Sequence, residues 1–106
     1  MTPAELAEKL RSPAPPCLLD VREPQEHALV ALPHSTLIPL GQLLQRAGEI
    51  AAWKNADVVV YCHHGIRSLH AIGLLRQLGF TSLHNLSGGI DQWAGEVDPT
   101  DRKSVV

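Results

Sequence analysis

The residue whose type and setting most favour chemistry is Cys62, which follows a run of apolar residues and opens a short polar segment. The apolar run is Val58-Val59-Val60-Tyr61, and the segment is Cys62-His63-His64-Gly65-Ile66-Arg67-Ser68. A β-branched run that leads into a glycine-bearing loop and then a helix places the thiol at the end of a strand, beside the free N–H groups of the helix start. Such N–H groups and nearby cations lower the pKa of a cysteine from about 8.5 to between roughly 3.5 and 7.5. We therefore predict that Cys62 is a nucleophile at neutral pH.

Four neighbours in this segment would determine the environment of the thiol. Arg67 either folds back onto carbonyl groups of the loop or points at a bound anion. Gly65 indicates a left-handed backbone or a close backbone approach, which a cradle of N–H groups requires. His63 and His64 are each a cation near the thiol, a general acid or an exposed polar residue. We expect them to make the loop mouth positive together with Arg67, which favours a small anionic substrate.

Two other chemistries compete for the same cysteine. A metal site would draw on Cys62, His63, His64 and His70. Structural zinc sites use two spaced pairs of ligands, and adjacent histidines on a tight loop seldom point at one centre, so we predict that no metal is bound. Disulfide or redox-sensing chemistry would join Cys62 to Cys17, which requires Cα atoms within about 7 Å of each other.

The composition limits the class of protein in which this chemistry would occur. The chain has 106 residues, of which 44% are hydrophobic and 19% charged, and its formal net charge is -2. This suffices for one domain with one modest core, and it gives no reason to expect nucleic acid or a membrane as a partner. The first residues lack a signal-peptide pattern, and no apolar run approaches the roughly 18 residues of a membrane span. With two cysteines and no disulfide framework, we expect a cytoplasmic protein.

The pattern of apolar residues predicts helices and strands in alternation. Thr2, Pro3 and Glu5 are typical of a capped helix start, and Gly79 stands where a helix C-terminal cap belongs. Residues 40–50 carry apolar side chains at the spacing of one helix face. The predicted helices are residues 3–10, 25–31, 40–50, 69–78 and 90–94, and the predicted strands are residues 17–21, 36–38, 57–61 and 82–86.

This alternation predicts an α/β fold, with a mostly parallel sheet covered by helices on both faces. Ligands of such sheets bind at the carboxyl ends of the strands, where Cys62 is expected to lie. We expect residues 1–98 to form a single domain and residues 99–106 to form a flexible C-terminal tail.

Four ordered segments resemble the signatures of the rhodanese domain, the fold of single-domain thiosulfate sulfurtransferases. They cover most of the chain and stand at the spacing of that family. The segments are residues 18–24 with Glu26, residues 33–39, residues 58–68, and residues 86–90 with Trp93. One departure is Ala31-Leu32-Pro33-His34-Ser35, where the family commonly has His-Ile-Pro-Gly-Ala. The resemblance implies a rhodanese-like three-layer α/β/α fold with a sheet of four or five strands.

The resemblance also implies that Cys62 accepts a sulfane sulfur and becomes a persulfide, without a metal or organic cofactor. The loop that would hold the substrate consists of His63, His64, Gly65, Ile66, Arg67 and Ser68. Phosphatases of the Cdc25 type have a loop one residue longer, so phosphatase or arsenate reductase activity is a minor alternative. The implied donor is thiosulfate or another small anionic sulfur donor, or a persulfide donor, which includes a protein. The implied acceptor is cyanide, a thiol or a protein.

Supporting residues and a rival function follow from the same resemblance. Asp20 and Arg22 either brace the loop by hydrogen bonds or form an ion pair that only shapes the turn, and Glu26 is expected to be structural. Residues 32–35 and 88–99 are similar to rhodanese modules appended to ubiquitin-activating-like enzymes. The rival is therefore a non-catalytic or relay module that carries persulfide sulfur between partner proteins of molybdopterin or thiolation pathways.

Overall fold

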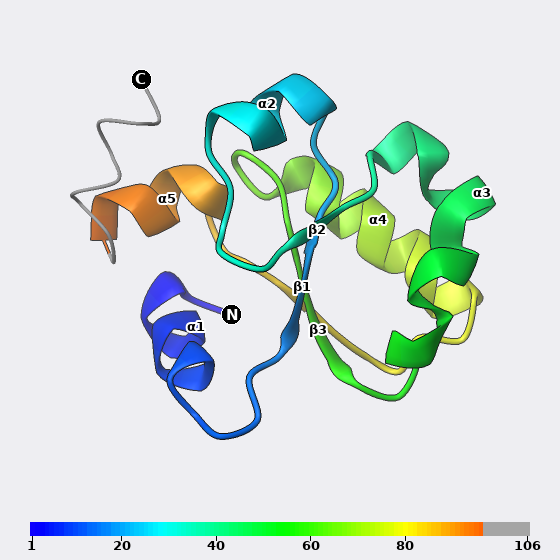
Figure 1. Ribbon diagram of the computed structural model, residues 1–106, viewed down its shortest axis with the longest axis horizontal. Helices are drawn as coiled ribbons and strands as arrows, with labels where there is room; N and C mark the ends of the chain where they lie inside the picture. Colours follow the sequence, from blue (N-terminus) through cyan, green and yellow to red (C-terminus); the bar gives the residue numbers. More distant parts are fainter. Residues whose placement is uncertain (97–106) are drawn as a thin grey trace.

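The computed structural model describes residues 1–96, which form a parallel β-sheet covered by helices on both faces (Figure 1). The strands are β1 (Cys17–Asp20), β2 (Thr36–Leu37), β3 (Asp57–Tyr61) and β4 (Ser82–Asn85). Their order across the sheet is β2-β1-β3-β4, and each neighbouring pair runs parallel. The predicted α/β fold with a parallel sheet is confirmed. The predicted tail, residues 99–106, lies outside the described residues.

Helices alternate with these strands along the chain. The α-helices are α1 (Pro3–Leu10), α2 (Pro24–Leu29), α3 (Leu43–Arg46), α4 (Ile66–Gln77) and α5 (Gly89–Glu96), and the 3-10 helices are η1 (Leu40–Gln42) and η2 (Ala47–Trp53). The predicted cap of the first helix is confirmed, because the Thr2 side chain and the Glu5 side chain each accept the other residue's backbone N–H. Within the described part of the chain, no helix has the length and apolar character needed to cross a bilayer.

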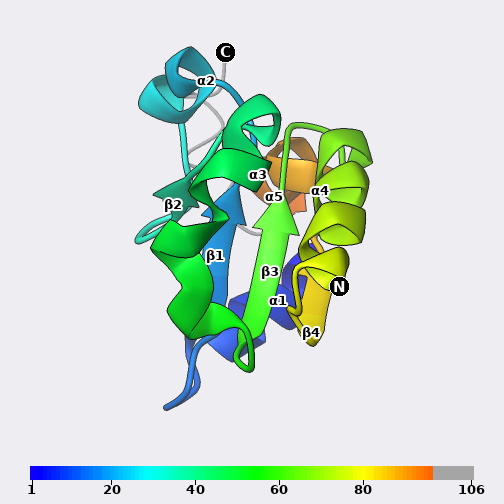
Figure 2. The ribbon, with the colours of Figure 1, turned by 90° about the vertical axis from the view of Figure 1, so that its right-hand side faces the viewer.

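The sheet separates two apolar cores, which gives the fold three layers (Figure 2). One core lies against α3, η2 and α4 and includes Leu75 of α4. The other lies against α1 and α5 and includes Trp93 of α5. Val58 and Val60 of β3 enter the first core and Val59 enters the second, because successive side chains of a strand point to opposite faces. The central strand is therefore covered on both sides.

The predicted single helix over residues 40–50 is wrong. The chain there forms η1, the short helix α3 and η2, with a kink at Ile50 (φ -117°, ψ 21°). Gly41 and Gly48 weaken a continuous α-helix, because glycine loses the most backbone freedom when it is ordered. Ile50 still faces the core, but Leu44, which the helical spacing placed on the same face, is exposed. A spacing of three residues also suits a 3-10 helix, so the apolar pattern does not distinguish an α-helix from a 3-10 helix.

The helix α2 lies beyond the end of the sheet toward which the strands point (Figures 1 and 2). It begins at Pro24, which suits the first position of a helix because its fixed φ is already helical. No residue of α2 is buried. The loop from β3 to α4 lies at the same end, so α2 and this loop together border the edge where a ligand of a parallel sheet is expected.

Candidate active site

Cys62 follows β3 directly and lies at the carboxyl edge of the sheet. The last four residues of β3 are fully buried, and the cysteine itself is 1% exposed. Beyond it the chain turns away from the sheet and enters α4, which begins at Ile66 instead of the predicted Leu69. Arg67 and Ser68 therefore belong to the first turn of α4, whose N–H groups have no partners within the helix. The sulfur lies next to these donors.

Gly65 directs backbone donors toward the sulfur. Its φ is 102°, which confirms the predicted left-handed position, and glycine adopts this conformation without a steric penalty. The Gly65 N–H donates to the Cys62 Sγ at 3.0 Å, and the Ser68 N–H donates to the same sulfur at 3.4 Å. Two backbone donors thus converge on one atom, an arrangement that stabilises a thiolate or another sulfur anion.

Ser68 and Asn85 extend this arrangement below the sulfur. The Ser68 Oγ lies 3.4 Å from the Cys62 Sγ, and the Ser68 hydroxyl donates to the Asn85 Oδ1. A hydroxyl has one hydrogen, and that of Ser68 is donated to Asn85. In this geometry the Ser68 Oγ therefore accepts a hydrogen bond from the S–H group of the neutral thiol. When the thiol ionises, the hydroxyl is able to rotate and donate to the sulfur. Asn85, at the end of β4, is thus the acceptor of the Ser68 hydroxyl while the thiol is neutral.

The surroundings of Cys62 change the pKa of its thiol in two directions. Burial raises the pKa, because a thiolate loses hydration in the interior. The Ser68 hydroxyl and the backbone N–H groups of Ser68, Gly65 and Arg67 lower it, because they donate to the anion. The lowering effects outweigh burial, so the pKa of Cys62 lies below its ordinary value. This agrees with the reactivity predicted from the sequence.

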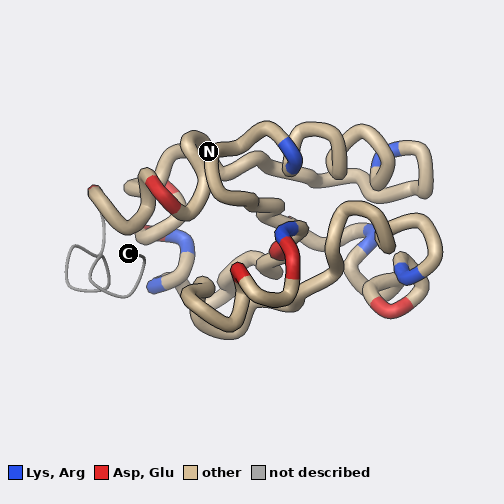
Figure 3. Tube along the Cα trace, turned by 90° about the horizontal axis from the view of Figure 1, so that it is seen from above, with Lys and Arg blue, Asp and Glu red and all other residues tan. Residues whose placement is uncertain are grey.

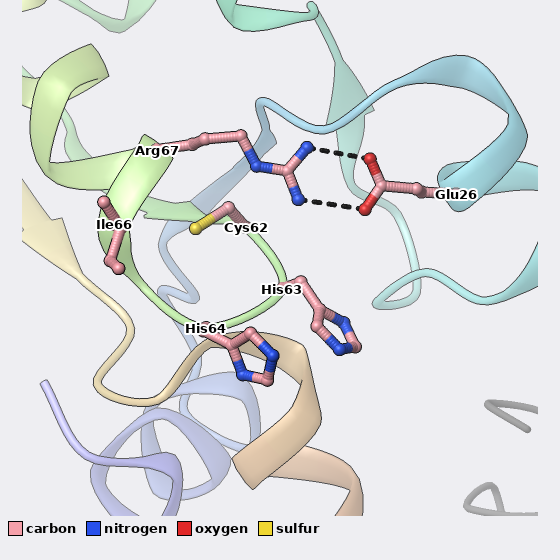
Figure 4. A pocket seen from close by; sticks show the side chains of 6 residues that line it. All are labelled: Glu26, Cys62, His63, His64, Ile66 and Arg67. Carbon is pink, nitrogen blue, oxygen red and sulfur yellow. Dashed lines mark hydrogen bonds and ion pairs between the residues drawn. The ribbon is translucent and has the colours of Figure 1, made fainter.

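Arg67 pairs with Glu26 instead of with the loop carbonyls or an open anion site (Figure 4). Its Nη1 and Nη2 donate to the two carboxylate oxygens of Glu26 at 2.8 and 2.9 Å. Glu26 comes from the first turn of α2, where its Oε1 also accepts the Glu23 N–H at 3.0 Å. The hydrogen bonds from Arg67 lower the pKa of Glu26 to about 2. The sequence-based expectation that Glu26 is only structural is incomplete, because its carboxylate borders the cleft at Cys62.

His63 and His64 do not contact the sulfur. Their rings lie edge to face with centroids 4.1 Å apart, and Figure 4 shows both directed away from the Cys62 Sγ. The His64 Nδ1 lies 3.8 Å from the Asp91 carboxylate. The predicted positive mouth is therefore revised: Arg67 and His64 each face a carboxylate, and the pKa of Cys62 is lowered by the loop's hydrogen bonds.

A small cleft of about 230 Å³ opens over the sulfur. Its lining consists of Glu26 and five residues of the loop and first helical turn, namely Cys62, His63, His64, Ile66 and Arg67. Most of the loop predicted to hold the substrate is thus brought to one opening, while Gly65 and Ser68 contact the sulfur from its buried side. Ile66 is 78% exposed and presents an apolar side chain at the rim.

The start of α5 holds the carbonyl groups of the loop. The Ile90 N–H donates to the Cys62 carbonyl at 2.9 Å, and the Asp91 N–H donates to the His63 carbonyl at 3.2 Å. A Cβ atom on Gly89 would lie 2.4 Å from the Cys62 carbonyl oxygen, closer than such atoms approach. The absence of a side chain at Gly89 therefore lets α5 dock directly against the loop.

Asp20 and Arg22 form an ion pair next to the site. The Arg22 Nε and Nη2 donate to the two Asp20 oxygens at 2.9 and 2.8 Å, and the Arg22 Nη2 also donates to the Val30 carbonyl at 2.6 Å. The pair is almost fully buried, and His27 adds a contact to Asp20 at 2.9 Å. Among the contacts described for residues 1–96, neither Asp20 nor Arg22 bonds to the loop that follows Cys62. Of the two predicted roles, the structure has the ion pair that shapes the turn.

Two rival chemistries were considered for Cys62, a disulfide with Cys17 and a metal site. Cys17 pairs with Val58 in the sheet, and Cys62 lies four residues beyond Val58. At about 3.3 Å per residue, the two cysteines are about 13 Å apart along the strands, too far for a disulfide. Both are free thiols, so the alternative of a Cys17–Cys62 disulfide within one chain is wrong. Across residues 1–96, no three His, Cys, Asp or Glu side chains gather as metal ligands.

The sequence did not predict the part that two residues take in the site: Glu26, which was expected to be structural, and Asn85. Glu26 meets Arg67 across 41 positions, and Ser68 meets Asn85 across 17 positions. The one signal for Glu26 is its place in the first turn of a capped helix that follows a strand, which puts a carboxylate near the ligand-binding edge of the sheet. Asn85 carries the weaker signal of a polar residue at the end of a predicted strand.

Comparisons with known proteins agree with this arrangement. A model of the rhodanese-like domain family matches residues 2–96. The probable adenylyltransferase/sulfurtransferase MoeZ of Mycobacterium tuberculosis is 33% identical over 99 residues, which are 93% of this chain and 25% of MoeZ. A sulfurtransferase of Allochromatium vinosum is 37% identical over 89 residues, covering 84% of this chain and 81% of that protein. The solved structure of the human single-domain sulfurtransferase TSTD1 superposes with a TM-score of 0.78 at 28% identity, over 91% of this chain and 95% of that one.

Proposed function

Because the chain belongs to the rhodanese-like domain family, we propose that it is a sulfurtransferase that carries sulfane sulfur as a persulfide on Cys62. The observation that carries the proposal is the convergence of the Gly65 and Ser68 N–H groups on the Cys62 Sγ, at 3.0 and 3.4 Å. These donors favour the negative charge of the Cys62 thiolate before transfer. After transfer the charge of the persulfide anion would be on its outer sulfur, next to the same loop and its N–H groups.

The proposed reaction has two displacement steps. The Cys62 thiolate attacks the sulfane sulfur of thiosulfate or of a persulfide donor, a new S–S bond forms, and the donor's S–S bond breaks. Sulfite or a thiolate leaves with the bonding electron pair. A thiophilic acceptor such as cyanide, a thiol or a protein thiolate then attacks the outer sulfur and restores the Cys62 thiolate. No outside oxidant or reductant is required, and a reducing compartment such as the cytoplasm would keep Cys62 ready to react.

The minor alternative, a phosphatase or arsenate reductase, has less support. Such enzymes need an arginine that is free to bind an oxyanion during attack by the cysteine. Here Arg67 already donates two hydrogen bonds to Glu26. This pairing favours sulfur transfer over chemistry on a phosphate or arsenate group.

A relay module that receives sulfur from one protein and passes it to another is the second candidate. It is favoured by the exposed apolar side chains beside the cleft: Ile66 is 78% exposed and Leu69, one turn further along α4, is 59% exposed. Exposed apolar side chains of this kind suit contact with the surface of a partner protein. Slow turnover with a high KM for thiosulfate, together with fast sulfur transfer from a persulfidated protein, would favour the relay.

The test of the proposed function compares two cysteine variants. Cys62→Ser should abolish thiosulfate:cyanide activity and the cyanide-labile sulfur of the protein. Cys17→Ser is the matched control, since Cys17 lies at the opposite end of the sheet and should leave both unchanged. Full activity in Cys62→Ser would overturn the mechanism.

A further inference from the structure

We propose that Glu26 sets the donor specificity of Cys62 by disfavouring dianionic donors such as thiosulfate, so that the protein draws its sulfur from persulfides. This inference rests on the proposed function. A persulfide carries at most one negative charge on its two reacting sulfurs, whereas thiosulfate carries two charges on a group that must enter the cleft whole.

The permanent charges at the cleft cancel. Among residues 1–96, Arg67 is the one lysine or arginine that lines it, and Glu26 is the one carboxylate. Of the other lysines and arginines in residues 1–96, Arg22 lies at this end of the sheet but is paired with Asp20, and the rest are spread over the fold (Figure 3). An incoming dianion therefore meets a thiolate and a carboxylate, and its single permanent counter-charge is already occupied.

Glu26 is held in place from both sides. Its carboxylate accepts two hydrogen bonds from Arg67 and a third from the backbone N–H of Glu23, which belongs to the capping box of α2. A donor that bound Arg67 would have to break the pair and would leave the Glu26 carboxylate beside it. Glu26 has a pKa of about 2 in this pair, so it stays ionised at any working pH.

The rim of the cleft suits an organic group. Ile66 lines the cleft and is 78% exposed, and Leu29, which is 61% exposed, lines an adjoining hollow together with Glu26 and His63. An apolar rim gains from contact with the carbon chain of a thiol persulfide, and it offers nothing to a hydrated sulfonate. Charge and apolar surface thus select the same class of donor.

The reaction balances without a further reagent. The Cys62 thiolate attacks the outer sulfur of a persulfide R–S–SH, the new Sγ–S bond forms as the donor's S–S bond breaks, and the R–S⁻ group that leaves takes up the proton. The protein is left with the persulfide anion on Cys62, under the Gly65 and Ser68 N–H groups.

The experiment compares two small donors that differ by one charge. Methanethiosulfonate ion and thiosulfate both deliver a sulfane sulfur, but a methyl group replaces one charged oxygen in the former. The rate at which each loads one sulfur onto the protein is followed by intact mass. Glu26→Gln should raise the rate with thiosulfate by about tenfold and the rate with methanethiosulfonate by less than about threefold, because a charge affects a dianion more than a monoanion. Glu49→Gln is the matched control: it breaks a similar pair with Arg46, outside the cleft, and should change neither rate.

Two further donors identify the source of the persulfide. Cysteine persulfide and a persulfidated cysteine desulfurase should each be tested against thiosulfate on the unchanged protein. Faster loading from the first supports a small-thiol source, and faster loading from the second supports a protein source. The inference about Glu26 fails if thiosulfate loads sulfur faster than both persulfide donors. It also fails if Glu26→Gln leaves the ratio of the thiosulfate and methanethiosulfonate rates unchanged. In either case the proposed function stands. If no donor loads sulfur, the proposed function itself fails.

Discussion

Two arginine–carboxylate pairs lie near the carboxyl end of the sheet, and they differ in burial and in what surrounds them. Asp20 and Arg22 are 0% and 2% exposed, and Arg22 also contacts the Val30 carbonyl and lies 5.5 Å from the centre of the Tyr61 ring. Glu26 and Arg67 are 29% and 38% exposed and border the cleft at Cys62. The hydrogen-bond lengths within the two pairs are nearly equal.

Burial, and not bond geometry, therefore separates the roles of the two pairs. If the buried pair loses one partner, the other is left as a charge without water, which is strongly destabilising. If the exposed pair opens, water solvates both groups, so the pair contributes little to the free energy of folding. Loss of the exposed pair should therefore leave the fold intact, and loss of the buried pair should not.

The largest effect is expected from breaking the buried pair. Arg22→Met should lower the free energy of unfolding by about 3–5 kcal/mol, because it leaves the Asp20 carboxylate buried without its arginine. Urea unfolding measures this change. The matched control Arg46→Met removes an exposed arginine from its pair with Glu49 and should lower the free energy of unfolding far less, because water solvates the carboxylate that is left. A loss of similar size in both variants would contradict the division between the pairs.

A smaller effect, on the pKa of Cys62, is expected from Ser68, which is buried as Asp20 and Arg22 are. Ser68→Ala removes the hydroxyl that helps to lower the pKa of Cys62, so the pKa should rise. The rate of alkylation by iodoacetamide follows the thiolate, and its rise with pH should move to higher pH in this variant. Ser12→Ala removes an exposed hydroxyl that donates to the Lys9 carbonyl, far from Cys62 in the chain, and should leave the profile in place. An unchanged profile in Ser68→Ala would show that the hydroxyl does not stabilise the anion.

The smallest effect is expected on stability when the exposed pair is broken. The folded pKa of Glu26, about 2, lies below its ordinary value of 4.5, so its contribution is present above about pH 4.5 and is lost as the pH falls through about 2. Glu26→Gln should lower the free energy of unfolding at neutral pH by about 1 kcal/mol or less, and the difference should shrink in acid. Urea unfolding at several pH values tests this. A loss as large as that of Arg22→Met would place Glu26 among the residues that hold the fold.

The sequence was sufficient for the parts of this comparison that depend on local pattern. The buried strand before Cys62, the left-handed Gly65 and the capped start of α1 follow from β-branched runs, a glycine in a tight loop and a short capping motif. Asp20 and Arg22 are two positions apart, so their pairing was one of two predicted alternatives. Each of these features is determined by residues close together in the chain.

The parts that the sequence did not predict depend on contacts between distant elements. Glu26 reaches Arg67 only because α2 lies over the same end of the sheet as α4, and Asn85 reaches Ser68 only because β4 is next to β3. The positive charge predicted for the mouth of the loop after Cys62 was wrong for the same reason, because the carboxylates that face Arg67 and His64 come from α2 and α5. The broken helix near Ile50 has a different cause, because its apolar spacing fits two kinds of helix.

The central claim, that Cys62 carries sulfur, is tested most directly by mass spectrometry of the protein after exposure to one equivalent of a sulfane donor and digestion without reductant. The peptide that contains Cys62 should gain one sulfur atom, and it should lose that atom on addition of cyanide. Sulfur on the Cys17 peptide alone, or no gain from either a persulfide or thiosulfate, would contradict it.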